Sequence, residues 1–350
     1  MSYFREAINF MEEYIPGEQP EKEGYIKLNT NENPYPPSPL VEKKIKEALG
    51  LGKISLYPHP LGGELRERAQ EVYGLPLDWI VVGNGSDELL NLLFRLFLDK
   101  GDRVAYPFPT YTLYRTLAFL QEAEREEIPF PPDFSLPESF LTSPAKLKVV
   151  CNPNSPTGTF LPLSQIEKLL SLSSCPVIVD EAYVDFAPCS ALPLLQKFPN
   201  LIIVRTFSKS FSLAGLRVGL LFAHPDIVRG VLKIKDSYNV GILSQAGGAA
   251  ALEDMEHMRK NVEKIKFTRE WFSAEMEKLG FLVYPSQANF IMARKEGRDL
   301  KFLYEELKKR KILVRYFPQW PDSLRITIGK EEEMKTLLDA IQEIIGRVNV

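Results

Sequence analysis

Residues 201–217 read Leu-Ile-Ile-Val-Arg-Thr-Phe-Ser-Lys-Ser-Phe-Ser-Leu-Ala-Gly-Leu-Arg. An apolar run of strand length, Leu201–Val204, leads into a polar loop in which Lys209 stands between Ser208 and Ser210. A lysine in apolar surroundings is suited to act as a nucleophilic amine, because burial destabilises its ammonium form. A solvated surface lysine is the usual alternative, and the apolar surroundings argue against it.

Strand and helix patterns alternate on both sides of this stretch, from about Val41 to Tyr238. The alternation predicts an α/β fold with a mostly parallel sheet between helices. The strand-length runs are Ile80–Val82, Arg103–Ala105, Lys148–Cys151, Val177–Val179, Leu201–Val204 and Gly219–Phe222, and the helical stretches include Asp87–Phe97, Tyr111–Leu120 and Leu163–Leu170.

Both ends of the chain depart from this alternation. Residues 3–14 predict a helix, and a proline-rich arm follows as far as Pro39, which we expect to lie across the small domain or a second subunit. After Ser244, a long amphipathic stretch from about Asp254 to Leu279 predicts one helix that links two domains. We therefore predict an arm at 1–40, a large domain at 41–243 and a smaller α+β domain at 244–350. Its expected strands are Leu282–Tyr284, Asn289–Ala293 and Leu324–Ile328, and its expected helices are Leu300–Arg310 and Glu331–Ile345.

The composition excludes several classes of function. The 350 residues carry a net charge of −3, which gives no reason to expect nucleic acid or an anionic membrane as a partner. The apolar runs are too short to span a bilayer, and no signal-peptide core is recognised, so we expect a soluble, cytoplasmic protein. The three cysteines and three histidines show no metal-ligand spacing, so we expect no metal site.

The first of four candidate site segments is Ile80-Val-Val-Gly-Asn-Gly-Ser-Asp-Glu88. The glycines at 83 and 85 allow the backbone to approach a ligand closely. A helix that starts near Ser86 or Asp87 would direct its N–H groups and its dipole at a phosphate. An ordinary capped turn between a strand and a helix is the alternative.

The second and third segments supply ionisable groups. In Val179-Asp-Glu-Ala-Tyr183, Asp180 ends a buried strand, so its carboxylate needs a cation such as a protonated pyridine nitrogen or a structural arginine. Tyr183 could reach an oxygen of the same ligand. In the stretch that carries Lys209, Arg217 could clamp a phosphate, with hydroxyl donors at Thr206 and Ser208.

The fourth segment is Cys151-Asn-Pro-Asn-Ser-Pro-Thr-Gly158, which follows another strand. Its two prolines and its glycine fix a rigid turn. Asn152 or Asn154 would then hold an amide donor over a ligand.

Taken together, in this order and spacing, the four segments resemble the fold-type I aminotransferases that use pyridoxal phosphate. The likeness runs through nearly the whole chain, and within that superfamily the sequence is most similar to the histidinol-phosphate aminotransferases. The motifs of this likeness are Leu28-Asn-Thr-Asn-Glu-Asn-Pro-Tyr35, Tyr57-Pro-His-Pro60, Tyr106-Pro-Phe-Pro-Thr-Tyr111, the Arg205–Arg217 run and Leu324-Arg-Ile-Thr-Ile-Gly329.

The resemblance implies a seven-stranded sheet in the large domain and roles for particular residues around pyridoxal 5′-phosphate. Lys209 would hold the cofactor as a Schiff base and later move the substrate's proton. Asp180 would pair with the pyridine nitrogen, Tyr183 would bond the phenolic oxygen, and Tyr111 would stack on the ring. The remaining cofactor residues would be Ser86, Asp87, Glu88, Asn152, Thr206, Ser208 and Arg217, with Tyr57 reaching in from a neighbouring subunit.

For the substrate, the resemblance implies that Arg325 holds the anionic end, with Arg315, Asn33 and, across a dimer interface, Tyr14 as further candidates. The reaction implied is amino transfer between L-histidinol phosphate and 2-oxoglutarate in histidine biosynthesis. The partners implied are small-molecule substrates and a second copy of the chain that completes the active site.

One position departs from the family pattern. The family commonly has an asparagine directly before Pro-Thr-Gly, where it bonds the cofactor's phenolic oxygen, and here that position is Ser155. We expect Asn152, three residues earlier, to take over this contact, and the alternative is that Tyr183 makes it with less help.

Three other functions stay open from the sequence. An aromatic or broad-specificity aminotransferase would share every cofactor residue. A threonine-phosphate decarboxylase would use the same scaffold to break the bond between Cα and the carboxylate, although residues 29–35 resemble the histidinol-phosphate group more. A non-catalytic binding module would be colourless, and it leaves Asp180, Tyr183, Lys209 and Arg217 as coincidences.

Overall fold

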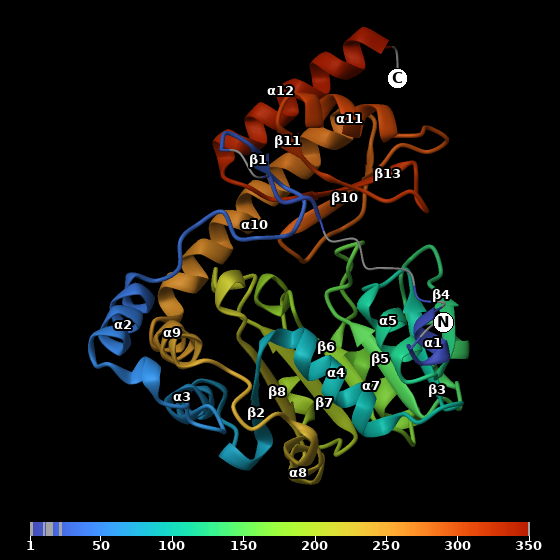
Figure 1. The fold of residues 1–350 in the computed structure, drawn as a ribbon. Helices are drawn as coiled ribbons and strands as arrows, with labels where there is room; N and C mark the ends of the chain where they lie inside the picture. Colours follow the sequence, from blue (N-terminus) through green and yellow to red (C-terminus); the bar gives the residue numbers. More distant parts are fainter. Residues whose placement is uncertain (1–2, 10, 12–16, 21–22, 349–350) are drawn as a thin grey trace.

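A seven-stranded sheet forms the larger part of the fold in the computed structural model, which describes residues 3–9, 11, 17–20 and 23–348 (Figure 1). The strand order is β2-β8-β7-β6-β5-β3-β4, and β8 runs antiparallel to its neighbours β2 and β7 while the other paired strands are parallel. The strands are β2 (Ile80–Gly83), β3 (Arg103–Phe108), β4 (Glu124–Pro129), β5 (Leu147–Cys151), β6 (Val177–Asp180), β7 (Leu201–Thr206) and β8 (Gly219–Ala223).

The central strands are mostly apolar, because helices cover both faces of a parallel sheet. Every residue of β5, β6, β7 and β8 is buried. The register pairs Asp180 with Cys151 on one side and with Val204 on the other. The carboxyl ends of these three strands therefore meet at one edge of the sheet.

Helices pack on and around this sheet, and α4 lies against β7 and β8. The helices α2 and α3 pack on α9 rather than directly on the sheet's centre (Figure 1). The helices of the chain as far as α9 are α1 (Glu6–Asn9), α2 (Pro39–Gly50), α3 (Gly63–Tyr73), α4 (Gly85–Phe97), α5 (Leu113–Leu120), α6 (Glu138–Leu141), α7 (Leu163–Leu172), α8 (Pro225–Ile234) and α9 (Ile242–Glu253).

The long helix α10 (Met255–Lys278) leads from α9 to a second group of elements, drawn at the top of Figure 1. There β12-β13-β10-β9 form a four-stranded antiparallel sheet, and the arm joins this group because β1 pairs in parallel with β11. The elements are β1 (Ile26–Lys27), β9 (Leu282–Val283), β10 (Phe290–Arg294), α11 (Lys301–Lys309), β11 (Ile312–Leu313), β12 (Arg315–Tyr316), β13 (Ser323–Thr327) and α12 (Glu331–Val348).

The strands and helices predicted between residues 80 and 345 are present with small changes of length, but the strands β1, β4, β11 and β12 were not predicted. Strand β4 reads Glu-Arg-Glu-Glu-Ile-Pro, a charged sequence that forms the edge of the sheet beside β3. Within the described part of residues 3–14, only α1 is helical. The domain limits at 40 and 243 stay predictions.

Candidate active site

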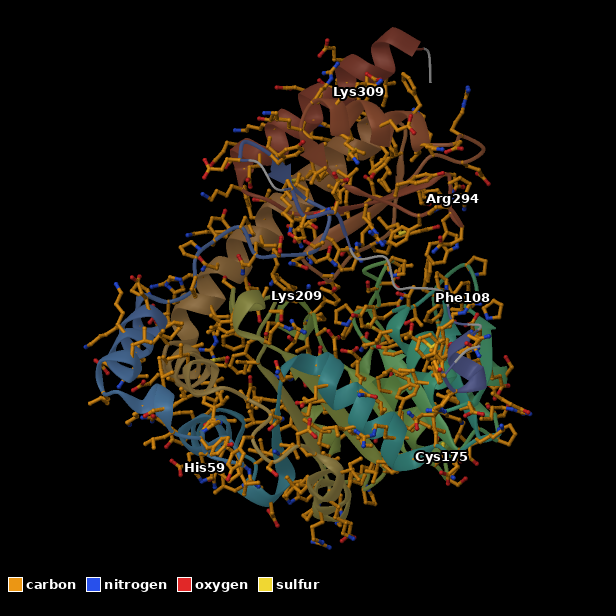
Figure 2. All side chains as sticks on the ribbon, in the orientation of Figure 1. His59, Phe108, Cys175, Lys209, Arg294 and Lys309 are labelled. Carbon is orange, nitrogen blue, oxygen red and sulfur yellow. The ribbon has the colours of Figure 1, made fainter. Side chains whose placement is uncertain are left out.

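A cavity of about 270 Å³ lies at the carboxyl edge of the large sheet, between the sheet and the C-terminal group of elements. Figure 2 shows Lys209 between the two groups. Eleven of the residues predicted from the sequence line this cavity. They are Ser86, Asp87, Tyr111, Asp180, Tyr183, Thr206, Ser208, Lys209, Arg217, Arg315 and Arg325.

Lys209 lies on the loop that follows β7, and its Nζ donates to the backbone oxygen of Thr30 at 3.2 Å. Burial, together with the nearby charge of Arg325, lowers the pKa of Lys209 from 10.5 to about 8. Asn33 donates to the backbone oxygens of Lys209 and Ser210 at 3.0 and 3.1 Å. Asn33 thus fixes the backbone of the loop that carries Lys209.

Asp180 ends β6 and is only 2% exposed. Its Oδ2 accepts a hydrogen bond from the Tyr114 hydroxyl at 2.7 Å, and its Oδ1 accepts one from the Ala182 N–H at 3.1 Å. Burial nevertheless raises the pKa of Asp180 from 3.8 to about 6. A cation at the cavity side of this carboxylate would offset that cost.

In the sequence analysis, a structural arginine was the alternative partner for Asp180. The buried arginine nearby, Arg205, pairs with Glu181 instead. Arg205 contacts Glu181 through Nε and Nη2, at 2.9 and 2.8 Å, and both side chains are buried. The Asp180 carboxylate is therefore left to face the cavity.

The start of α4 and the Arg217 side chain form a cradle for an anion. Arg217 Nη2 contacts Asp87 Oδ2 at 3.0 Å, and Nη1 donates to Ser208 Oγ at 3.3 Å. Gly85 makes this approach possible, because a Cβ there would lie 2.6 Å from Arg217 Nη2. Thr206 donates to Ser208 at 2.9 Å and completes a cluster of hydroxyls beside the helix N-terminus.

Two arginines lie side by side on neighbouring strands of the small sheet. Arg315 of β12 and Arg325 of β13 are direct cross-strand partners, and both line the cavity. Arg325 donates to Ser155 Oγ at 3.3 Å and to the backbone oxygen of Asn29 at 3.1 Å. Like charges directly opposite each other are destabilising, so this pair is suited to an anion that lies between them.

The hydroxyl of Tyr183 accepts a hydrogen bond from Asn31 Nδ2 at 2.9 Å. Burial raises the pKa of Tyr183 to about 12, so the phenol stays protonated at neutral pH. Thr327 donates to Asn31 Oδ1 at 3.0 Å and so orients the amide. The contacts of Asn31 and Tyr114 were not predicted from the sequence, although Asn31 lies in the quoted 28–35 motif.

Asn152 requires a correction. Its Nδ2 donates to the backbone oxygen of Leu161 at 3.0 Å and its Oδ1 accepts from the Leu161 N–H at 2.8 Å, so the amide is engaged on both sides. Ser155 lines the cavity, and Asn152 is not found among the described residues that do. Asn31 is the amide that donates to the Tyr183 hydroxyl.

Three further predicted residues lie outside the cavity wall as far as the structure describes it. The Glu88 carboxylate accepts from Asn239 Nδ2 at 2.7 Å, next to the turn before α4. Asn33 lies behind the lysine loop. Tyr57 is 80% exposed and stacks on Tyr238 with ring centroids 4.4 Å apart. Tyr14 lies outside the described residues.

Comparison with known proteins finds a family model that matches most of the chain. Residues 23–341 match the family model described as aminotransferase class I and II. Histidinol-phosphate aminotransferase 1 of Trichormus variabilis is 42% identical over 348 residues, which are 98% of this chain and 99% of the relative. The histidinol-phosphate aminotransferase of Rhodopirellula baltica is 42% identical over 353 residues, with 99% and 97% covered.

Among solved structures, the crystal structure of histidinol-phosphate aminotransferase from Sinorhizobium meliloti in complex with pyridoxal-5′-phosphate superposes with a TM-score of 0.89. The superposition covers 99% of both chains at 24% identity. At that identity the likeness shows a shared fold.

Proposed function

Because this chain belongs to the class I and II aminotransferase family, we propose that it transfers an amino group between L-histidinol phosphate and 2-oxoglutarate. Its fold-type I arrangement confirms the fold class predicted from the sequence. The observation that carries the choice of substrate is the cross-strand pair of Arg315 and Arg325 on the cavity that also holds Lys209. The full-length relatives named for histidinol phosphate support the same substrate.

The residues of the cavity fit pyridoxal 5′-phosphate. The cradle of Gly85, Ser208 and Arg217 would hold the phosphate, and it exists only because residue 85 has no Cβ. The buried carboxylate of Asp180 is suited to a protonated ring nitrogen. Lys209, with a pKa lowered to about 8, is suited to covalent attachment.

The chain's own residues would orient the cofactor and the substrate. When bound, pyridoxal phosphate supplies an aldehyde that condenses with amines and a protonated ring that withdraws electrons from the neighbouring carbon. Asp180 would hold the ring nitrogen, Tyr183 would donate to the phenolic oxygen, and Tyr111 would cover one face of the ring. Arg325, anchored by Ser155 and Asn29, would hold the substrate's anionic end.

Lys209 would move the proton. Because the pKa of Lys209 is lowered to about 8, its Nζ is unprotonated in a fraction of the molecules at neutral pH, and this fraction grows at mildly alkaline pH. As an unprotonated amine, Nζ would remove the proton from the substrate's Cα. The hydrogen bond to the Thr30 backbone oxygen places Nζ beside the arm.

Two alternative functions keep the same cofactor residues. A threonine-phosphate decarboxylase would also need an arginine pair for its phosphate, and an aromatic aminotransferase would need an arginine for a carboxylate. The Arg315–Arg325 pair favours a phosphate over a single carboxylate, because two arginines on neighbouring strands line the same cavity.

A donor assay separates these functions. The enzyme loaded with pyridoxal phosphate would be given histidinol phosphate, phenylalanine or threonine phosphate, each with 2-oxoglutarate, and glutamate and carbon dioxide would be measured. We expect glutamate from histidinol phosphate well above that from phenylalanine. Faster reaction with phenylalanine, or carbon dioxide without glutamate from threonine phosphate, would refute the proposed substrate.

We also propose that two copies of the chain form the active unit, in the cytoplasm. Residues 51–57 expose an unusual run of apolar side chains, and solvent-exposed apolar patches mark interfaces. Ile54, Leu56 and Tyr57 are 60, 66 and 80% exposed. A symmetric partner would cover them and would receive Tyr57 at its own site. In the part of the chain that the structure describes, no helix could cross a membrane.

A further inference from the structure

Phe317 lies in the loop between β12 and β13, is half-buried and lines the cavity. The guanidinium carbons of Arg315 and Arg325 lie 5.6 and 5.7 Å from the centre of its ring. Trp320, from the same loop, meets the Phe317 ring edge-on with centroids 5.5 Å apart. One aromatic ring is therefore shared by the two arginines of the anion site.

This shared ring opposes the repulsion within the arginine pair. Arg315 and Arg325 are direct partners across two antiparallel strands, where like charges repel. The electron-rich face of an aromatic ring attracts a cation within roughly 6 Å of its centre, and both guanidinium groups meet that condition. Phe317 can thus attract Arg315 toward Arg325, which Ser155, Asn29 and the Phe290 ring also hold in place. An aliphatic residue at 317 would lack this attraction.

The ring cluster is also fixed against the large sheet. Trp320 packs on Phe108, at the end of β3, with centroids 5.7 Å apart. Figure 2 shows Phe108 on the upper side of the large group of elements, where that group faces the C-terminal one. The loop that carries Phe317 is therefore held in place over the cavity from both sides.

We propose that Phe317 is a specificity-determining residue, which keeps Arg315 and Arg325 converged so that the site prefers a phosphate dianion to a carboxylate. A carboxylate is satisfied by the two parallel N–H groups of one guanidinium, and Arg325 is already anchored for that task by Ser155 and Asn29. A phosphate dianion gains from the second arginine as well. This inference rests on the proposed function and names the residue that sets its choice between the two kinds of anion.

The test compares two half-reactions of the enzyme loaded with pyridoxal phosphate, one with histidinol phosphate and one with glutamate, each followed by the change in cofactor absorbance. For Phe317→Leu we expect the half-saturating concentration of histidinol phosphate to rise about tenfold and that of glutamate less than about threefold. Phe317→Tyr, which keeps the ring, should stay within about twofold of the wild type for both. We expect the half-saturating concentrations to change more than the maximal rates, because Phe317 contacts the two arginines proposed to bind the anion.

Phe302→Leu is the matched control, because Phe302 lies on α11 and is 46% exposed. An equal rise for both substrates in Phe317→Leu, or the same loss in Phe317→Tyr, would overturn the inference. If thermal melting shows that Phe317→Leu is unfolded, Phe317→Met replaces it with the same expectations.

A binding measurement separates this inference from the proposed function. Inorganic phosphate and acetate would be titrated into the loaded enzyme, with tryptophan fluorescence as the signal. Trp79 and Trp271 would be replaced by phenylalanine in every variant, so that Trp320 alone reports the binding. We expect Phe317→Leu to weaken the binding of phosphate more than that of acetate. If this holds while the wild type does not use histidinol phosphate, the proposed function fails and the role of Phe317 stands. Equal weakening of the two anions counts against Phe317 whichever donor the enzyme uses.

Discussion

Burial shifts the pKa values of the two central ionisable groups toward each other. The pKa of Lys209 falls from 10.5 to about 8, and that of Asp180 rises from 3.8 to about 6. Both shifts favour the neutral form, because each charge has been removed from water. A ligand that brings an aldehyde to Lys209 and a protonated nitrogen to Asp180 offsets the cost of burying both groups. Each of the two residues could be picked out from the sequence, because it is an ionisable group that ends or follows a buried strand.

The Tyr114 hydroxyl is expected to keep Asp180 ionised. Removing it in Tyr114→Phe takes away a hydrogen bond to a charged acceptor, which is worth roughly 1.5–3 kcal/mol. We therefore expect the dissociation constant for pyridoxal phosphate to rise about tenfold or more at neutral pH, as measured by equilibrium dialysis. Tyr106→Phe is the control, since its hydroxyl donates to Glu127 at 2.9 Å and lies in the same layer. Equal losses in the two variants would show that Tyr114 acts only through packing.

In the cofactor-free protein, the buried charge of Asp180 should lower the free energy of unfolding. Its pKa is higher in the folded protein than in the unfolded chain, so the folded state binds more protons between pH 3.8 and about 6. Ionising Asp180 therefore destabilises the fold above pH 6, and this penalty disappears as the pH falls below 3.8. We expect cofactor-free Asp180→Asn to exceed the wild type in unfolding free energy by up to about 3 kcal/mol at pH 8.

Denaturant titrations of the two proteins at pH 8 and pH 4 measure this difference. The advantage of Asp180→Asn should shrink at pH 4, where the wild-type carboxyl is largely protonated. An advantage of the same size at both pH values would contradict the account, because it would not depend on the ionisation of Asp180.

Secondary structure could be predicted wherever burial dictates the pattern. The runs that became β6 and β7 are continuous and apolar, and α10 carries an amphipathic repeat, so their periods are visible in the sequence. Strand β4 could not be recognised, because an edge strand needs only one neighbour and its charged side chains reach solvent. Asn152 was misassigned for a related reason. Its amide closes a local turn with Leu161, and the sequence does not reveal that pairing.

The turn between β2 and α4 offers a test of the anion cradle. Gly85 has a φ of +78°, and a methyl group there would lie 2.6 Å from Arg217 Nη2. We expect Gly85→Ala to lose about 1 kcal/mol of stability from its backbone conformation and, in addition, to bind pyridoxal phosphate at least about tenfold more weakly. Spectroscopic titration with the cofactor measures the second effect.

Gly101→Ala provides the matched control for this turn. Gly101 has a φ of +83° and no atom within 4 Å of its added Cβ. Gly101→Ala should thus share the loss of stability and keep the cofactor affinity. If both variants retained full affinity, the approach of Arg217 to Gly85 would not matter for binding.

At the scale of the whole molecule, the cavity draws on residues that are far apart in the sequence. The arm supplies Thr30 and Asn31, the large sheet supplies Lys209 and Asp180, and β13 supplies Arg325. The identities of most of these residues could be predicted from motifs. How they converge could not, because convergence depends on the pairing of β1 with β11 and on the path of α10.

The exposed segment 51–57 gives a prediction about assembly. Replacing Ile54 and Leu56 with aspartate places charges where we expect a second copy to pack, so the double variant should shift from dimer to monomer in analytical ultracentrifugation. It should also hold pyridoxal phosphate less tightly, because the partner's Tyr57 is withdrawn. Phe267→Asp is the control, since Phe267 is 71% exposed on α10. A wild type that sediments as a monomer would refute the proposed dimer.

The helix α10 is the long connection, or lever arm, between the two groups of elements. Its 24 residues, at about 1.5 Å each, make a rod of about 36 Å whose foot is tied down where Ser38 donates to Asp254 at 2.6 Å. A swing of about 5° at that foot moves the far end by about 3 Å, which is the length of a hydrogen bond. Lys209 comes before this helix in the chain and Arg325 after it, so a swing of that size would change the distance between two side chains that line one cavity.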